Sequence, residues 1–211
     1  KKCMKDPSVW VIAFMVMGCY ALTTTLNGYA SKIATIGFGT SATMAAVIGM
    51  FNQYFKPFGA IGGGFLSDRV GASKTLFVAI GALIIGTLAI AFMPKSSATL
   101  VLFLVIFAIT IVFVGIARGQ FYAPMQEAKI PLNLTGTATG LIATIAYTPD
   151  IFLPPISGKI LDTFEGAQAL QYILLMLAAF GLFALIMCVI FIKINKKNIE
   201  ELQQEKKERR L

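Results

Sequence analysis

Three ionisable side chains stand inside long apolar stretches of this 211-residue chain: Lys56, Arg118 and Asp150. A charge at bilayer depth costs at least about 2.5–3.5 kcal/mol, so it normally faces protein or a water-filled cavity rather than lipid. For Lys56 we predict a cation that faces a central cavity and binds an anionic group; a snorkelling lysine or a structural ion pair is the alternative. Asp150 follows Pro149, which disrupts a helix. It could carry a proton, hydrogen-bond a substrate or neutralise Lys56.

Polar side chains accompany these charges at helical spacing. Tyr20, Thr24 and Asn27 recur at i, i+4 and i+7, and such a stripe on a spanning helix faces either a cavity or another helix. Asn52 shares a helical face with Lys56 at i, i+4. The candidate substrate-binding residues are therefore Lys56, Asn52, Tyr20, Asn27 and Tyr147, with Asp150 as the candidate proton-coupling residue.

A charged, glycine-flanked turn is predicted over residues 64–74, between two apolar segments. Arg118 is placed where it can pair with Asp68 in a gate, with substrate contact as the alternative role. Asp68 also precedes an apolar segment, where a carboxylate favours a helix N-terminus. The candidate gating residues are Gly64, Asp68, Arg69, Gly71 and Arg118.

The elements that must position these residues are membrane-spanning helices. The composition is 57% hydrophobic and 13% charged, which is typical of a membrane protein. A bilayer core of about 30 Å requires roughly 20 apolar residues in a helix. The predicted fold is an all-α membrane domain over residues 1–194, followed by a charged tail over 195–211. Its six predicted spans cover about residues 9–29, 41–65, 75–93, 98–123, 136–160 and 170–194. Glycine pairs at 59/63, 115/119 and 136/140 predict close helix packing.

The basic residues are divided unevenly between the two ends of these spans. One end collects Lys1, Lys2, Lys5, Arg69, Lys74, Lys129, Lys193, Lys196, Lys197, Lys206, Lys207, Arg209 and Arg210. The other end has Lys32, Lys95 and Lys159. The positive-inside rule therefore predicts that both termini and the 64–74 turn are cytoplasmic. We read the tail as a solvated helical extension, with a docking site as the alternative. Because the chain opens on lysine, we also expect a preceding segment.

Several function classes are disfavoured. Histidine is absent, and Cys3, Cys19 and Cys188 are odd in number and scattered, so no metal site, disulfide framework or cofactor is predicted. There is no nucleophile–base pair or phosphate loop, so no enzyme is predicted. The formal charge of +8 could suggest a nucleic-acid partner, but its distribution indicates membrane orientation instead.

The segment Gly64-Phe65-Leu66-Ser67-Asp68-Arg69-Val70-Gly71 is similar to the loop signature of the major facilitator superfamily, G-x-L-[AS]-D-R-x-G followed by basic residues. Here Ala72 and Ser73 stand where the basic residues usually follow, and Lys74 comes one step later. That departure resembles the weaker copy of the motif in the carboxy-terminal half of the family.

Further segments agree with that half. Residues 5–10 resemble the start of the seventh helix, and residues 118–123 and 130–140 resemble parts of the tenth and eleventh. Residues 148–154 resemble a motif of poorly characterised bacterial permeases in the superfamily. The resemblance implies a twelve-helix, alternating-access transporter of which this chain forms helices seven to twelve. Its first and fourth helices would line the cavity, its second and fifth would flank it, and its third and sixth would face lipid.

The predicted function is secondary transport of a small organic solute across the bacterial inner membrane. We expect a proton-coupled anion, such as a sugar acid or a carboxylate. The expected partners are the lipid bilayer and an amino-terminal six-helix half. The alternatives are a non-transporting six-helix scaffold, a truncated remnant, or a half-transporter that acts as a homodimer. The reading frame upstream of Lys1 in the genome would separate these hypotheses, since six further spans encoded there favour the twelve-helix transporter.

Overall fold

The computed structural model describes residues 6–208, and for Phe51, Asn52 and Lys207 it describes the backbone alone. Within this range the chain is helical, without strands. A π-helical turn, Ile33–Gly37, follows α2, and a 3-10 turn, Ser97–Thr99, precedes α5. The α-helices are α1 (Pro7–Gly28), α2 (Ala30–Lys32), α3 (Ala42–Val70), α4 (Ala72–Phe92), α5 (Leu100–Gly119), α6 (Pro124–Glu127), α7 (Leu132–Ala146), α8 (Pro149–Thr163), α9 (Gly166–Ile194) and α10 (Lys196–Glu208).

Local sequence explains how the long helices begin. Asp6 precedes α1, and its side chain accepts a hydrogen bond from the Ser8 amide at 2.9 Å. Pro7 occupies the first helical position, where its missing N–H removes no helical hydrogen bond. Ser41 caps α3 in the same way, accepting from the Met44 amide at 3.2 Å.

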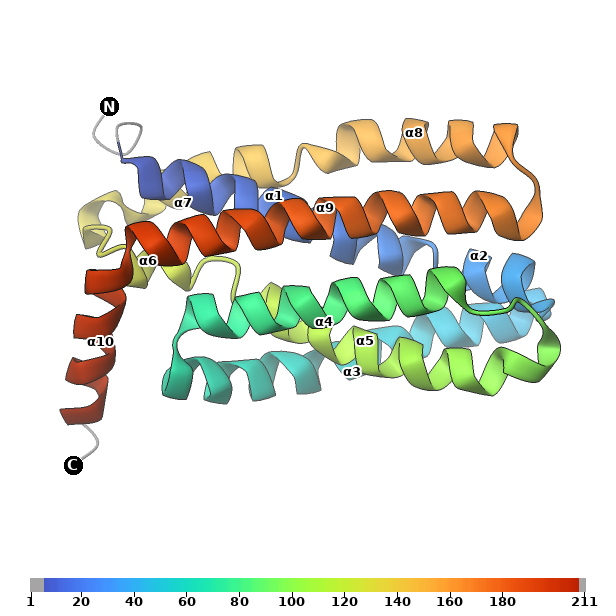
Figure 1. The fold of residues 1–211 in the computed structure, drawn as a ribbon, viewed down its shortest axis with the longest axis horizontal. Helices are drawn as coiled ribbons and strands as arrows, with labels where there is room; N and C mark the ends of the chain where they lie inside the picture. The colour runs from blue at the N-terminus through green and yellow to red at the C-terminus, as the bar shows by residue number, and fades with distance from the viewer. Residues whose placement is uncertain (1–5, 209–211) are drawn as a thin grey trace.

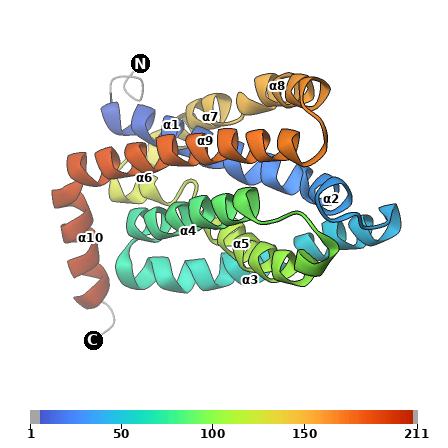
Figure 2. The same ribbon diagram turned by 45° about the vertical axis from the view of Figure 1, so that its right-hand side comes forward.

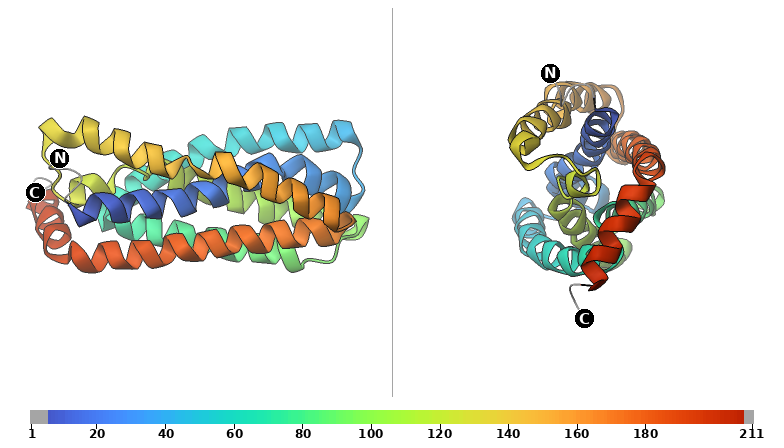
Figure 3. Two further views of the ribbon diagram at one scale, coloured as in Figure 1. Left: turned by 90° about the horizontal axis from the view of Figure 1, so that it is seen from above. Right: turned by 90° about the vertical axis from the view of Figure 1, so that its left-hand side faces the viewer.

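The long helices form an elongated bundle with two groups (Figure 1). One group contains α1, α7, α8 and α9; the other contains α3, α4 and α5, and α4 packs against α9 to join them. The end-on view in Figure 3 shows the two groups side by side. Figure 2 shows α10 turning away from α9 and crossing the end of the bundle beside α6. We call this end, where α1 begins and α9 finishes, the terminal end.

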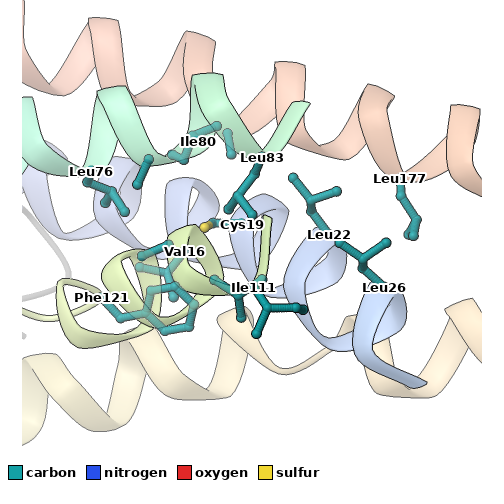
Figure 4. Packing of buried hydrophobic residues seen from close by; sticks show 14 of the residues in the cluster. Val16, Cys19, Leu22, Leu26, Leu76, Ile80, Leu83, Ile111, Phe121 and Leu177 are labelled. Atoms are coloured by element: carbon teal, nitrogen blue, oxygen red, sulfur yellow. The ribbon is translucent and has the colours of Figure 1, made fainter. Parts of the chain in front are cut away.

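The core lies around α1, between α4, α5 and α9 (Figure 4). Cys19 and Leu22 of α1 are fully buried, and they lie among Leu83, Ile111 and Leu177 from the other three helices. Burial on several sides suits a helix that is apolar around most of its circumference. α1 therefore contacts helices of both groups, and two of its polar residues, Ser8 and Thr23, are buried together with the apolar ones.

A glycine seam joins α3 to α5. A Cβ added to Gly59 would lie 2.0 Å from the Val112 carbonyl oxygen, and one added to Gly115 would lie 2.1 Å from that of Lys56. The predicted close packing at these glycines is confirmed. The same prediction for Gly136 and Gly140 is wrong within the described part of the chain, because nothing lies within 4 Å of a Cβ at either position.

The helix boundaries correct three expectations. α3 continues to Val70, so most of the predicted 64–74 turn is helical and the chain leaves the helix only at Gly71, which has φ +103°. Packing of Gly63 against Ile116 holds this last part of α3 on α5. α5 ends at Gly119, although the span was predicted to reach residue 123. The predicted span 136–160 is two helices, α7 and α8, because Pro149 cannot donate to a continuous helical ladder.

Four helical segments of the described chain are long and apolar enough to cross a membrane: Pro7–Gly28, Ala72–Phe92, Ser97–Gly119 and Gly166–Ile194. α3 has 29 residues but also contains Lys56, Asp68 and Arg69. α7 and α8 have 15 residues each. The fold is thus all-helical with at least these four candidate spans.

Candidate functional site

A hydrogen bond joins Tyr20 of α1 to Asp150 of α8. The Tyr20 hydroxyl donates to Asp150 Oδ2 at 2.7 Å. Asp150 lies in the first turn of α8, where the helix dipole favours a carboxylate. The break between α7 and α8 leaves Tyr147 beside this pair, with its ring edge-on to Tyr20 at 4.6 Å between centroids. The structure therefore brings together three residues that the sequence singled out separately.

Arg118 reaches the same place from α5. Its Nη2 donates a hydrogen bond to the Thr24 hydroxyl at 2.7 Å, and its Cζ lies 5.7 Å from the centroid of the Tyr20 ring. This distance is within the range of a cation–π contact. Tyr20 thus contacts a cation with its ring and a carboxylate with its hydroxyl.

Tyr122, which follows α5, completes the arrangement. Its hydroxyl lies 3.1 Å from that of Tyr147. We call these six residues the Tyr20 cluster: Tyr20, Thr24, Arg118, Tyr122, Tyr147 and Asp150. Sequence reasoning missed Tyr122, whose only signal is its place four residues after Arg118.

The Tyr20 cluster lies on an uncovered side of the bundle. Arg118 and Asp150 are exposed, Tyr147 is 42% exposed, and Tyr20 is partly exposed. Tyr20 and Arg118 belong to two of the candidate membrane spans. Because a charged group facing lipid is costly, this side is suited to face water or another protein body.

Lys56 lies near this cluster on α3. Its carbonyl oxygen lies against Gly115, one turn before Arg118. The ammonium donates to Gln53 Oε1 at 2.7 Å and is partly exposed. The two cations thus belong to the neighbouring helices α5 and α3, whereas Asp150 belongs to α8.

The remaining substrate-binding candidates are placed differently. The Asn27 side chain donates to the Thr23 carbonyl of its own helix at 2.6 Å. The side chain of Asn52 lies outside the described part of the chain.

The gating candidates lie at the terminal end, apart from Arg118. Asp68 Oδ1 is 3.5 Å from the ammonium of Lys206 on α10. The predicted pairing of Arg118 with Asp68 is wrong, since Arg118 turns toward Thr24 and Tyr20. Of the other motif residues, Arg69 is exposed and Gly64 is half-buried.

Glu127 performs a role that the sequence suggested for Asp68. Its Oε2 accepts a hydrogen bond from the Ser73 amide at 3.0 Å and so caps the N-terminus of α4. The side chain is buried, with 2% of the residue exposed. Gly71 provides the space, because a Cβ there would lie 2.9 Å from Glu127 Oε1. Nothing in the sequence near Glu127 distinguishes it from a solvent-exposed glutamate.

Comparison with known proteins places the chain among inner membrane proteins, although no family model matches it. It is 30% identical over 210 residues to the inner membrane protein YihN of Escherichia coli (strain K12), a match that covers 96% of this chain and 49% of YihN. It is 26% identical over 197 residues to the inner membrane protein YqcE of the same organism, covering 91% of this chain and 46% of YqcE.

A shorter match, 29% identical over 111 residues, links 46% of the chain to half of an uncharacterized protein of Mycoplasma pneumoniae. The chain spans about half the length of the curated relatives it matches. With its four apolar helices, it is a multi-pass protein of the bacterial inner membrane.

Proposed function

We propose that this chain is the carboxy-terminal six-helix half of a secondary transporter of the major facilitator type. The transporter moves a small organic anion across the bacterial inner membrane by alternating access and couples this movement to protons. The Tyr20 cluster carries the proposal: it places charged groups on an uncovered side of membrane helices, where a second half and a water-filled cavity would meet them.

The cations supply the anion specificity. Arg118 presents a planar guanidinium that can donate two parallel hydrogen bonds to a carboxylate, and Lys56 adds a second positive charge from α3. The rings of Tyr20 and Tyr147 offer apolar surface beside these charges. A sugar acid or another small carboxylate combines the two chemistries, an anionic head with a body that packs on aromatic rings.

Asp150 supplies the proton coupling. In its ionised form it accepts the Tyr20 hydroxyl. When a proton from water binds Asp150, the carboxylate loses its negative charge, and the cations are left to attract the substrate anion alone. Protonation of Asp150 would therefore favour anion binding. Release of the proton and the anion to the cytoplasm would restore the Tyr20–Asp150 hydrogen bond.

Two further observations support a six-helix half. Six long helical units follow one another in the bundle when the broken pair α7–α8 is counted as one. The chain also matches about half of each E. coli relative, which leaves room for a second half. The concentration of basic residues at the terminal end favours a cytoplasmic position for that end.

The coupling role is tested with the full-length protein in proteoliposomes. The assay follows uptake of radiolabelled sugar acids and carboxylates under an imposed pH gradient. Asp150→Asn should abolish proton-driven accumulation and preserve exchange of preloaded substrate. Asp162→Asn is the matched control, since Asp162 is an exposed carboxylate at the other end of the same helix. An Asp150→Asn protein that accumulates substrate as the wild type does would contradict the assignment.

The anion site is tested in the same vesicles. A hydrogen bond to a charged group contributes about 1.5–3 kcal/mol, so Lys56→Ala should raise KM at least about tenfold. Lys159→Ala, an exposed lysine of α8, is the control. If Lys56→Ala leaves the substrate affinity unchanged, Lys56 does not belong to the site. If the wild-type protein transports none of the radiolabelled sugar acids and carboxylates, the proposed transport is contradicted.

A further inference from the structure

α10 begins on a part of the bundle that holds it firmly before it crosses the terminal end (Figure 2). The break between α9 and α10 is Asn195, which is buried, and its Oδ1 accepts a hydrogen bond from the Ser8 hydroxyl of α1 at 3.2 Å. Asn195 Nδ2 donates to the Phe191 carbonyl at 3.2 Å. Ile199, one turn into α10, is also buried. The first turn of α10 therefore packs on the bundle.

Exposed ion pairs hold the middle and the end of α10. Lys129, which follows α6, pairs with Glu201, and Asp68 near the end of α3 lies 3.5 Å from the Lys206 ammonium. The carboxylate side chains of these pairs are 57% and 61% exposed, respectively. Exposed ion pairs contribute little to stability and are screened by salt, so such contacts alone would release α10 readily.

The backbone at Lys129 is adapted to this contact. Lys129 has φ +53°, in the left-handed region. Its amide donates to the Gln126 carbonyl at 3.0 Å, and the Ile130 amide donates to the Met125 carbonyl at 3.2 Å. This is the common end of a helix at which glycine usually occupies the left-handed position. Glycine would suit the backbone better, but it could not pair with Glu201.

A hydrogen-bond donor and an acceptor border one small space beneath the middle of α10. Glu127 Oε1 and Gln203 Nε2 are both buried, and among the described residues neither has a hydrogen-bond partner. They lie 2.9 and 3.1 Å, respectively, from the position that a Cβ on Gly71 would take. A buried carboxylate oxygen or amide group without a partner is costly. One hydrogen bond between them would satisfy both, and the missing side chain of Gly71 leaves room for it.

We propose that α10 is a strap that closes on the terminal end by a hydrogen bond from Gln203 Nε2 to Glu127 Oε1. Glu127 Oε2 already accepts a hydrogen bond from the Ser73 amide at 3.0 Å, so closing joins α10, α6 and the start of α4 through one carboxylate. Because Glu127 is 2% exposed, salt screens this bond much less than it screens the exposed ion pairs. Opening releases α10 and leaves the bundle folded. The strap does not depend on the proposed transport function.

Hydrogen exchange of the α10 amides, followed by mass spectrometry of the purified full-length protein, tests the strap. A hydrogen bond to a charged group changes the closed-to-open ratio about 10- to 100-fold, so Gln203→Leu should accelerate exchange by about that factor. Gln203→Glu should accelerate it further, because two carboxylates would meet. Gln203→Lys should keep α10 protected, since its ammonium can pair with Glu127. The controls are Gln204→Glu and Gln204→Lys at the exposed neighbouring position, which should stay within about twofold of the wild type.

Three outcomes overturn the proposal. Equal exchange in Gln203→Glu and Gln203→Lys would show that this side chain acts by packing and not by a bond to a carboxylate. Exchange at the wild-type rate in Gln203→Leu would exclude the Gln203–Glu127 bond. If Gln203→Glu fails to fold, the wild type decides in about 1 M potassium chloride, where ion pairs are screened. A closed strap should keep α10 protected there, and exchange at the rate of an unfolded peptide would overturn it.

Discussion

Replacing Gly115 by alanine tests the seam that holds Lys56 beside Arg118. The new Cβ would lie 2.1 Å from the Lys56 carbonyl oxygen and 3.1 Å from the Ala60 amide nitrogen. Both neighbours are backbone atoms, so no side-chain rotation relieves the contact. Overpacking a filled interface costs about 1–3 kcal/mol, and this site should lie at the upper end because the two helices must separate.

The expected net effect follows from the opposite contribution of helix propensity. Alanine in place of glycine stabilises a helix interior by about 1 kcal/mol. After this gain is set against the overpacking cost, the free energy of unfolding of Gly115→Ala should be about 2 kcal/mol lower than that of the wild type. Gly136→Ala is the control, because nothing lies within 4 Å of its Cβ, and it should gain up to about 1 kcal/mol. Unfolding of the full-length protein by titration with dodecyl sulfate, followed by circular dichroism, measures both.

The functional consequence is separable from the loss of stability. Moving α3 away from α5 also moves Lys56 away from Arg118. Under the proposed anion transport, KM should therefore rise in Gly115→Ala at temperatures where the protein is folded. Equal stability of the Gly115→Ala and Gly136→Ala proteins would refute the reasoning about the seam.

Two further predictions concern the terminal end. Gly71→Ala should destabilise the protein by about 1–3 kcal/mol, because its φ is +103° and its Cβ would lie 2.9 Å from Glu127 Oε1. Gly166 has φ +55° but nothing within 4 Å of an added Cβ, so Gly166→Ala should lower the free energy of unfolding by less in the same measurement. If the two variants lose the same free energy, the contact with Glu127 does not contribute. The Lys129–Glu201 ion pair lowers the pKa of Glu201 from its ordinary 4.5 and raises that of Lys129 from 10.5. Its contribution is therefore present between these two values and is lost as the pH falls through the lowered pKa of Glu201 or rises through the raised pKa of Lys129. Glu201→Gln should reduce the melting temperature slightly at pH 7 in low salt, and the reduction should shrink as the pH falls through the lowered pKa of Glu201; a reduction that does not change with pH would contradict this pair.

Much of the architecture could be predicted from local sequence. The apolar segments give helices near the expected positions, and the chain is a multi-pass inner membrane protein. The seam at Gly59 and Gly115 was also predictable, since residues four apart share a helical face. The helical continuation through Ser67 and Asp68 was not, because it depends on how the end of α3 packs against α5.

The candidate site could be predicted only as separate residues. Arg118, Asp150 and Tyr20 stood out because polar groups are costly in lipid, and that cost is a property of each residue alone. Their contacts join positions 94 and 130 residues apart, which no local pattern encodes. All the residues predicted for the site and gate therefore remain predictions of role, even where the structure gives their position: Lys56, Asn52, Tyr20, Asn27, Tyr147, Asp150, Gly64, Asp68, Arg69, Gly71 and Arg118.

The sequence alone determined that the chain is helical, that it belongs in a membrane and that a few charges need partners. The reason is that the length and hydrophobicity of each segment depend on that segment alone. Only the tertiary structure decided which partners they have. Arg118 contacts Thr24 rather than Asp68, and Glu127 rather than Asp68 caps α4. The physical reason is that pairing depends on the rotation and axial position of each helix. Both are set by packing over the whole bundle, and a shift of one residue turns a helical side chain by about 100°.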